Sequence, residues 1–386
     1  MAATLKCDTI QNASSSTANL TLDASGNATV GNTLAMGSSF KRNKIINGDM
    51  RVDQRNAGAS VTPTSGAYFL DRWNCEHAQA SKYSVQQNAG AVTPPAGFTN
   101  YLGATSLSAY TLGATDYFQI KHRIEGYNVA DLAWGTASAK TITISFQVYS
   151  SLTGTFSGCL LNSAANRSYA FSYSVASANT WTTVSITIPG DTSGTWVKDN
   201  GMGLEIRFNL GVGSTYSVSS SGWSSSLQLA ITGSQSIVST NAATWYITGV
   251  QLEVGSVATP YERQIYSDQL AQCQRYCYVI AGGAVGNNYQ RIGTGPGQGT
   301  TSADIQIPIK VSMRIAPSFT ATAANTFALY DGATVTPCTT VAQDGATTAN
   351  MPVAGIATAS GLSSGKFYEF IFNNTTSGSL TLSAEL

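Results

Sequence analysis

Charged side chains are scarce in this sequence. Only 10% of its 386 residues are Asp, Glu, Lys or Arg, against roughly 25% in an average soluble chain. Lys and Arg together number 20, as do Asp and Glu, so the formal net charge is +0. No segment gathers the basic side chains that a run of nucleic-acid phosphates requires. The composition therefore argues against nucleic acid as a partner.

Long apolar runs are absent as well. No stretch approaches the roughly 18 apolar residues that a membrane-spanning helix needs. The first residues, MAATLKCDTI, lack the basic start and the apolar core of a signal peptide. We therefore expect that the protein does not insert into a membrane. We also expect it to be synthesised in a cytoplasm, so that an extracellular role would require release by lysis.

Residues for metal or nucleophilic chemistry are few. The only histidines are His77 and His122, and no HExxH pattern occurs. The six cysteines contain no CxxC pair, and we expect them to be reduced and mostly buried. Asp49, Asp71 and Glu253 could contribute to a calcium site, but no spaced Asp/Asn loop supports one. We therefore expect no metal and no cofactor.

The sequence is rich in period-two alternation of apolar and polar residues. Between about Arg42 and Tyr261 the alternation recurs in five segments bounded by Gly, Pro, Asn or Asp, namely 141–150, 181–190, 203–212, 226–233 and 244–255. Such segments are typical of half-buried antiparallel strands. Many short strands with tight turns and no helical periods between them predict an all-β fold, with an antiparallel β-sandwich or jelly roll over residues 42–261.

The first 41 residues contain too little apolar surface to fold alone. Its few apolar residues, such as Leu20, Leu22, Val30 and Leu34, are separated by residues that favour turns. So little burial cannot offset the conformational entropy lost on folding. We expect residues 1–41 to form a stem that becomes ordered when several copies wrap together.

One segment has helical spacing, in residues 260–280. Pro260 suits the start of a helix, and inward positions recur at intervals of three and four, at Ile265, Gln269, Cys273, Tyr276 and Ile280. This predicts a connecting helix of about five turns over 262–281, with Cys273 and Cys277 on one face. The helix could pack on its own sandwich or against its copies around a threefold axis.

Strand signals return after Gly282 and predict a smaller C-terminal β-sandwich over 282–386. The segments are 301–313, 317–322, 326–331, 366–374 and 378–386, so the last strand reaches Leu386. Residues 286–301 are rich in glycine and predict a long exposed loop. Its GTGPGQGT stretch is not followed by GK[ST], which argues against a phosphate-binding loop.

Three segments carry a resemblance to a known family. They are NKIINGDMRVDQRNAG (43–58) with YFLDRW (68–73), GDTSGTWVKDNGMGLEIRFNLGVGSTY (190–216) and TWYITGVQLEVGSVATPYERQIYSDQLAQCQRYCY (244–278). They resemble phage tail fibre and virion appendage proteins whose central domain is similar to carbohydrate-binding jelly rolls. The resemblance implies a homotrimer in the virion, held by its N-terminus to a tail, baseplate or adaptor protein. It also implies a C-terminal receptor-binding tip. The jelly roll itself can bind sugar or serve only as a spacer.

We therefore expect a structural fibre protein that mediates attachment to a host-surface glycan, and not an enzyme. A polysaccharide depolymerase tailspike is the alternative, and it would need two carboxylates about 5 to 10 Å apart. No local arrangement predicts such a pair among the candidates Asp116, Glu125, Asp131, Glu205 and Glu253. A glycan-specific lectin, or a capsid or baseplate fibre without receptor contact, also fits the sequence.

Glycan binding requires aromatic rings on which the C–H faces of a sugar can lie. Trp73, Trp181 and Trp245 lie in or next to strand-like segments, so we expect them in the core. The glycan-binding candidates lie near Gly or Asn loops, where surface exposure is expected, and they are Trp134, Trp196, Trp223 and Tyr289.

Overall fold

The computed structural model describes Cys7, Thr9–Ile10, Leu20–Leu22, Ala24, Ala28–Val30, and residues 41–283 and 288–386. The chain divides into two compact units, Met1–Arg42 and Asn43–Leu386. In the first unit, strands β1 (Thr9–Ile10), β2 (Leu20–Leu22) and β3 (Ala28–Val30) pair antiparallel in one small sheet. Leu34 and most other residues of the expected stem lie outside the described residues.

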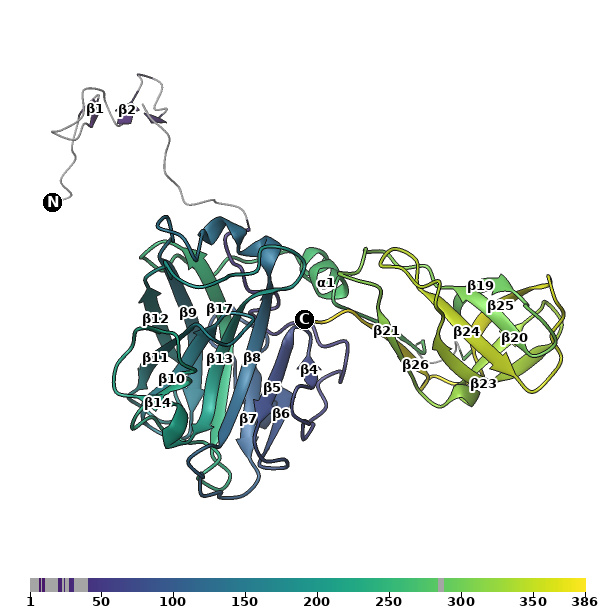
Figure 1. Cartoon of the computed structure of the whole chain (residues 1–386), viewed down its shortest axis with the longest axis horizontal. Helices are drawn as coiled ribbons and strands as arrows, with labels where there is room; N and C mark the ends of the chain where they lie inside the picture. The colour runs from purple at the N-terminus through teal and green to yellow at the C-terminus, as the bar shows by residue number, and fades with distance from the viewer. Residues whose placement is uncertain are drawn as a thin grey trace. The chain divides into compact units, whose positions relative to one another are not determined.

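The second unit begins with an antiparallel β-sandwich (Figure 1). Its seven-stranded sheet has the order β15 (Trp223–Ser224), β11 (Ser168–Val175), β10 (Gly154–Leu161), β13 (Met202–Val212), β8 (Tyr117–Glu125), β5 (Trp73–His77) and β4 (Tyr68–Leu70). Its five-stranded sheet has the order β12 (Thr182–Ile188), β9 (Ile142–Ser150), β17 (Thr244–Val254), β7 (Leu102–Ser106) and β6 (Tyr83–Gln87). The predicted all-β sandwich is therefore confirmed.

One hydrophobic core fills the space between the two sheets. In β9 the residues Ile142, Ile144, Phe146 and Val148 are buried at alternate positions, as the period of a half-buried strand requires. Trp73 and Trp245 are fully buried, which confirms the core prediction for both. Trp181 is only half-buried and packs against the separate cluster of Tyr101 and Tyr246.

Short elements lie in the connections between the strands of the sandwich. They are the parallel pair β14 (Ser217–Val218) and β16 (Ala230–Ile231) and the 3₁₀ turns η1 (Ala89–Ala91), η2 (Gly126–Asn128), η3 (Ala130–Leu132) and η4 (Ser214–Tyr216). The full strand predicted over 226–233 is therefore wrong, since only two of its residues pair. Its apolar residues Leu227 and Leu229 instead pack beside Tyr117 and Tyr216.

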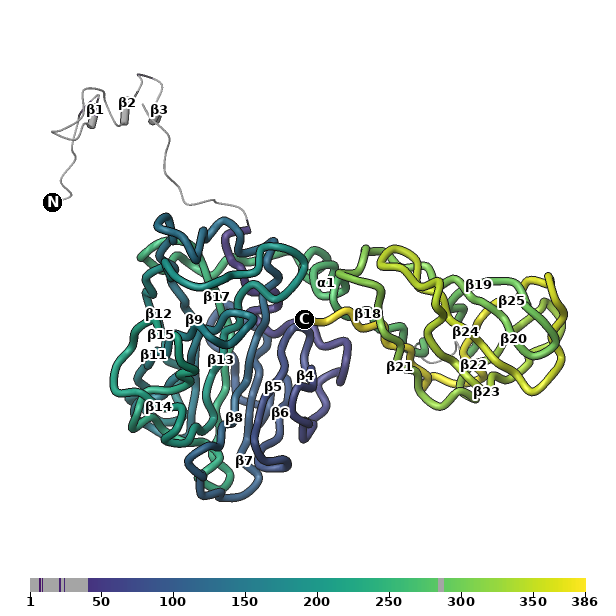
Figure 2. Tube along the Cα trace, in the orientation of Figure 1, coloured from purple at the N-terminus to yellow at the C-terminus, as the bar shows by residue number. Residues whose placement is uncertain are grey.

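The predicted connecting helix is shorter than expected. Helix α1 spans Tyr266–Gln274, and the chain then turns into strand β18 (Cys277–Ala281) (Figure 2). Cys277 and Ile280 therefore do not share a helical face with Cys273. The buried residues of α1 are Gln269 and Cys273, so this face packs against its own chain, which is the first of the two alternatives for the helix.

The C-terminal residues form a closed barrel rather than an open sandwich. The barrel order is β19 (Arg291–Pro296), β20 (Ser302–Gln306), β24 (Val353–Thr358), β23 (Val335–Gln343), β22 (Phe327–Tyr330) and β25 (Phe367–Phe372), with η5 (Ala324–Thr326) leading into β22. Strands β18, β26 (Ser379–Ser383) and β21 (Ser318–Ala321) form a three-stranded sheet beside it. The prediction of a loop over 286–301 is wrong for Arg291–Pro296, which form β19.

The end of the chain is ordered, as predicted from its last strand. Beyond β26, Leu386 O accepts hydrogen bonds from Tyr68 Oη at 3.0 Å and from Arg123. Glu385 forms ion pairs with Arg55 and Arg72. The last two residues are therefore fastened to the sandwich.

Two further predictions concern cysteines and membranes. All six cysteines are free, and all except Cys7 are buried, which confirms that they are mostly core residues. In the part of the chain that the structure describes, no helix combines the length and apolar character needed to cross a bilayer.

Candidate functional site

Three of the four aromatic candidates lie together at the edge of the seven-stranded sheet. The ring centroid of Trp134 is 4.8 Å from that of Trp196 and 5.1 Å from that of Trp223, and the last two are 5.6 Å apart. All three contacts are edge-to-face, the geometry that aromatic rings prefer. Their loops are far apart in the sequence, so folding assembles this cluster.

The tryptophan cluster is a packing feature. Trp134 is only 3% exposed and Trp196 only 8%, so the surface exposure expected for these two is wrong. Each indole N–H donates to a backbone carbonyl. Trp134 donates to Lys140 O at 2.8 Å, Trp196 to Ser193 O at 3.1 Å and Trp223 to Pro189 O at 2.7 Å. Trp223 is half-buried and is the one ring of the three with an accessible part.

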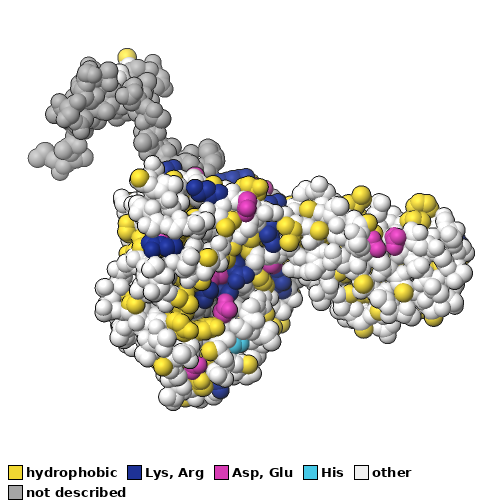
Figure 3. All heavy atoms as spheres, in the orientation of Figure 1, with side chains coloured by type: hydrophobic (Ala, Val, Ile, Leu, Met, Phe, Trp, Pro, Cys, Tyr) yellow, Lys and Arg dark blue, Asp and Glu magenta, His cyan; other side chains and the backbone are white. Residues whose placement is uncertain are grey.

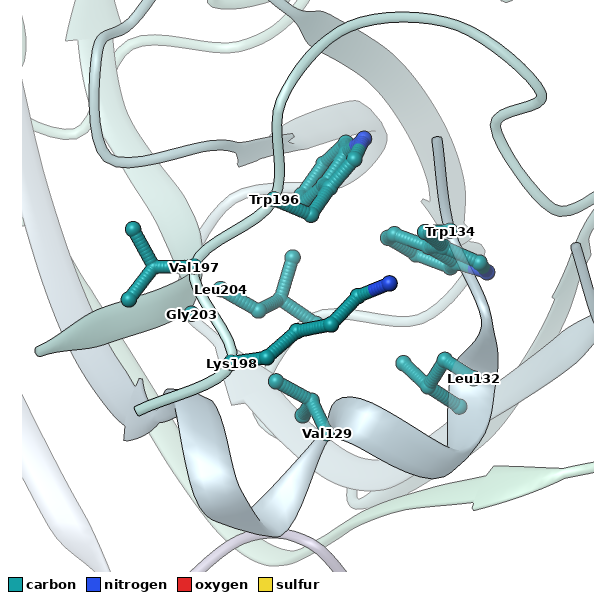
Figure 4. A pocket seen from close by; sticks show the side chains of 8 residues that line it. All are labelled: Val129, Leu132, Trp134, Trp196, Val197, Lys198, Gly203 and Leu204. Carbon is teal, nitrogen blue, oxygen red and sulfur yellow. The ribbon is translucent and has the colours of Figure 1, made fainter. Parts of the chain in front are cut away.

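The hollow beside this cluster is too small for a sugar. It is lined by eight residues, among them Leu132, Trp134, Trp196 and Leu204, and Figure 4 shows Lys198 extending across it toward Trp134. It has room for about one water molecule. The cluster therefore closes one end of the sandwich core, and in this conformation it cannot admit a sugar ring.

The fourth candidate, Tyr289, lies at an open groove on the barrel. The groove has a volume of about 270 Å³ and is lined by Tyr289, Arg291, Tyr330, Val335 and Ile371. Except for Tyr289, these residues come from four neighbouring strands, β19, β25, β22 and β23, and the pairs Arg291–Ile371 and Tyr330–Val335 lie in register. Strand pairing therefore fixes the relative positions of the groove residues.

The groove combines rings, an apolar floor and a charged pair. Ile371 is buried at its floor, whereas Tyr289 is 46% exposed. Arg291 Nε donates to Glu369 Oε2 at 2.7 Å, and this hydrogen bond raises the pKa of Arg291. The Arg291 side chain is 64% exposed, so part of its guanidinium remains available. Rings and exposed polar groups of this kind suit a ligand with C–H faces and hydroxyls.

A charged array lies on the outer face of the seven-stranded sheet. Glu205 on β13 is buried and pairs with Arg207 at 2.5 Å, Arg123 at 2.6 Å and Lys121 at 3.6 Å. Burial alone would raise the pKa of Glu205, but these three cations bring it below its ordinary value. Figure 3 shows Lys, Arg, Asp and Glu side chains gathered over this part of the sheet.

The array continues across the sheet through amides. Arg207 Nη1 donates to Gln119 Oε1 at 2.8 Å, and Gln119 Nε2 donates to Asn209 Oδ1 at 2.6 Å. Glu76 at its border also pairs with Lys121. These groups mainly satisfy one another, so the array offers fewer free contacts to a ligand than the barrel groove does.

The sequence analysis missed this array, although a signal for it exists. Lys121, Arg123 and Glu125 alternate along one strand, and Glu205 and Arg207 alternate along its neighbour. In a chain with only 10% charged residues, alternating charges on two strands indicate that one sheet face carries them. The pairing of the two strands could not be read from the sequence.

The other candidate carboxylates each bind their own neighbours. Asp116 accepts from Tyr110 at 2.8 Å, Asp131 pairs with Lys44 at 2.9 Å and Glu253 accepts from Thr259 at 2.6 Å. Glu125 pairs with Arg275 at 2.6 Å and accepts from Tyr276 at 2.6 Å. Burial opposes ionisation of Glu125, yet these contacts lower its pKa. Each of these carboxylates therefore has a structural contact.

His122 and the calcium candidates Asp49 and Asp71 also have contacts of their own. His122 is fully buried, its Nε2 lies 3.0 Å from Ile46 O, and burial lowers its pKa well below the ordinary value. Asp49 accepts from Gln269 at 2.6 Å, and Asp71 accepts from Gln54 at 2.7 Å. Among the described residues, no three His, Cys, Asp or Glu side chains are placed to hold a metal ion together.

Comparison with known proteins yields structural likenesses only. No family model and no curated protein matches the sequence. Among solved structures, the chain is similar to the enzymatically active domain of tailspike protein 4 of bacteriophage CBA120, with 10% identity over 55% of this chain and 22% of that one, and a TM-score of 0.31. This chain therefore matches 22% of the length of that domain.

Two further likenesses are to carbohydrate-binding modules. A CBM4 structure is matched with 15% identity over 55% of this chain and 99% of that one, at a TM-score of 0.29. The family 11 carbohydrate-binding module from Clostridium thermocellum, in complex with a mixed-linked tetrasaccharide, is matched with 11% identity. The match covers 52% of this chain and 98% of that one, at a TM-score of 0.27. At these identities and TM-scores, neither a family nor a function follows for this chain.

Proposed function

We propose that this chain is a structural component of a phage tail fibre and that it attaches the particle to a host-surface glycan through the barrel groove. The groove carries this proposal, because it is open and brings two tyrosine rings and an exposed arginine together over an apolar floor. Stacking of C–H faces on Tyr289 and Tyr330, with sugar hydroxyls bonding to Arg291 and Glu369, uses each of these features.

The remaining parts of the proposal rest on the sequence. The family resemblance supports a homotrimer in the virion, assembled in the host cytoplasm and held to a tail, baseplate or adaptor protein through residues 1–41. The low apolar content of that segment supports ordering by several copies. In chain order the sandwich then follows the attachment segment and precedes the barrel that carries the groove.

Binding to purified host-surface polysaccharide tests the glycan assignment. Tyr330→Ala removes one ring of the groove, and loss of a stacked sugar contact is expected to weaken binding by roughly tenfold, or about 1.4 kcal/mol. Trp181→Ala is the matched control, because it removes another half-buried ring, from the sandwich. Equal weakening by both variants, or none by Tyr330→Ala, would reject the groove.

The same incubation separates attachment from depolymerisation. A structural fibre retains the polysaccharide and leaves its chain length unchanged. Release of oligosaccharides over hours would instead identify a tailspike enzyme, and no retention at all would favour a capsid or baseplate fibre without receptor contact.

A further inference from the structure

A second hollow lies on the sandwich, between the segment that precedes β7 and the segment that leads into α1. Its volume is about 200 Å³, and its lining includes Asp49, Arg51, Gly97, Phe98, Arg263 and Gln264. Pockets for drug-sized ligands measure about 300 to 1,000 Å³. This hollow therefore has room for a single small group rather than a chain of sugars.

Arg263 is held in a fixed orientation at this hollow. Its guanidinium carbon lies 4.7 Å from the centre of the Phe98 ring and 5.9 Å from that of Tyr261, and the two rings contact each other at 5.2 Å. A cation over aromatic faces is stabilised by the ring quadrupole and keeps its N–H edge free for hydrogen bonds. Within residues 41–283 and 288–386, Arg263 forms no ion pair, so its charge is available to a ligand.

Gly97 contributes to this orientation. A Cβ at residue 97 would lie 2.6 Å from Arg263 Nη2, and the backbone φ of +83° there is one that other residues rarely adopt. Glycine thus leaves the guanidinium the space it occupies over the ring.

The second arginine of the hollow is partly compensated. Arg51 pairs with Asp49 at 2.6 Å and donates through Nη2 to Gln264 O at 2.8 Å. Two arginines and one aspartate leave the lining with one net positive charge. A guanidinium binds planar oxyanions through two parallel hydrogen bonds, so the charge balance favours a carboxylate.

Gln264 contributes a hydrogen-bond acceptor that needs a donor, whereas the arginines contribute donors. Its side-chain oxygen is buried and receives no hydrogen bond from any described residue. A buried acceptor without a donor costs roughly 1 to 3 kcal/mol. In this conformation the oxygen is out of reach of a water-sized group, so a ligand hydroxyl can donate to it only after the Gln264 amide turns into the hollow that the residue lines. Neither acetate nor another carboxylate without a hydroxyl can supply this donor.

We propose that this hollow binds a hydroxylated carboxylate, the chemical class of the acidic sugars. The carboxylate lies against Arg263, with Arg51 beside it, and a hydroxyl donates to Gln264 Oε1. This inference concerns a different surface from the barrel groove and does not rest on it.

Calorimetric titration of the full chain with glucuronate, glucose, acetate and inorganic phosphate tests the inference. Glucuronate is expected to bind, with an affinity that falls as salt is added, and glucose and acetate to bind at least tenfold more weakly. Arg263→Gln is expected to weaken glucuronate binding at least tenfold, and Arg263→Lys by less, because lysine keeps the charge but not the planar fork.

Lys310→Gln is the matched control, since it removes one exposed cation elsewhere and is expected to leave the affinity unchanged. Thermal melting checks that each variant is folded. Unchanged affinity in a folded Arg263→Gln variant, or equal affinity for glucose, would overturn the inference. Tighter binding of phosphate than of glucuronate would overturn the assignment to a hydroxylated carboxylate.

Discussion

Glu385 forms ion pairs with the buried Arg72 and the half-buried Arg55. Arg72 is only 1% exposed, and its guanidinium lies 3.6 Å from the centre of the Tyr276 ring. Arg55 contacts the other carboxylate oxygen of Glu385 at 2.7 Å. Burial by itself would disfavour the charged form of Arg72, but Glu385 raises its pKa. The end of the chain therefore contributes to stability through charge as well as through strand pairing.

Glu385→Ala is expected to lower the free energy of unfolding by about 3 to 5 kcal/mol, because it leaves buried guanidinium charge without its carboxylate. Urea denaturation followed by tryptophan fluorescence measures the change. Asp268→Ala removes an exposed carboxylate and is expected to cost less than about 1 kcal/mol. Equal losses in the two variants would contradict this role of Glu385.

Asp71 predicts a dependence of stability on pH. Its burial raises the pKa of this carboxyl from 3.8 to about 6, so between these values the folded protein binds more protons than the unfolded chain. Stability from this group is therefore present below about pH 4 and declines as pH rises toward 6.

The Asp71→Asn variant cannot lose that contribution. Its free energy of unfolding relative to the wild type is expected to rise by about 2 kcal/mol between pH 4 and pH 6. Denaturation curves at three or four pH values measure this difference. A difference that stays flat, or that falls with pH, would contradict the assignment.

At the residue scale, the sequence predicted burial better than contacts. Trp73 and Trp245 lie in alternating strands, so their periodicity placed them in the core. Trp134 and Trp196 lie beside glycines, which suggested exposure, but they bury each other through loops about 60 residues apart. No local pattern reports that contact.

At the scale of elements, β19 shows why glycine can mislead. Gly293 and Gly295 gave its sequence the character of a loop, yet both lie in a barrel strand. A Cβ on Gly295 would lie 1.9 Å from Asp304 O, and one on Gly293 would lie 2.4 Å from Gln306 O. The glycines are needed where a neighbouring backbone approaches closely, and strand propensity does not include that requirement.

Gly295→Ala is therefore expected to destabilise the barrel by about 1 to 3 kcal/mol through the clash with β20. Gly345→Ala is the control, because a Cβ there meets nothing within 4 Å and is expected to be nearly neutral. Thermal unfolding of both variants measures the contrast. A neutral Gly295→Ala would mean that β19 is not held against β20.

Helix α1 and strand β18 show the limit of periodicity. Tyr276 and Ile280 continue the helical spacing of Ile265, Gln269 and Cys273 by coincidence. The segment Cys277–Ala281 instead pairs residue by residue with β26, which lies about a hundred positions later. Because a short apolar run suits either structure, only its distant partner decides between helix and strand.

At the scale of the whole molecule, two arguments support the expected trimer, namely the low apolar content of the N-terminal segment and the family resemblance. The Gln269 and Cys273 face of α1, which could have packed against other copies, is buried in its own chain. Light scattering at low micromolar concentration is expected to give three times the chain mass of 40.3 kDa. Removal of residues 1–41 is expected to lower that mass. A stable monomer for the full chain would contradict the stem account.

Attachment through the barrel groove is tested most directly on particles. Virions assembled with the Tyr330→Ala chain are expected to contain the protein in normal amount but to adsorb to host cells roughly tenfold more slowly than virions with the unaltered chain. Virions with the Trp181→Ala chain should adsorb normally. Unchanged adsorption of the Tyr330→Ala virions would contradict the account.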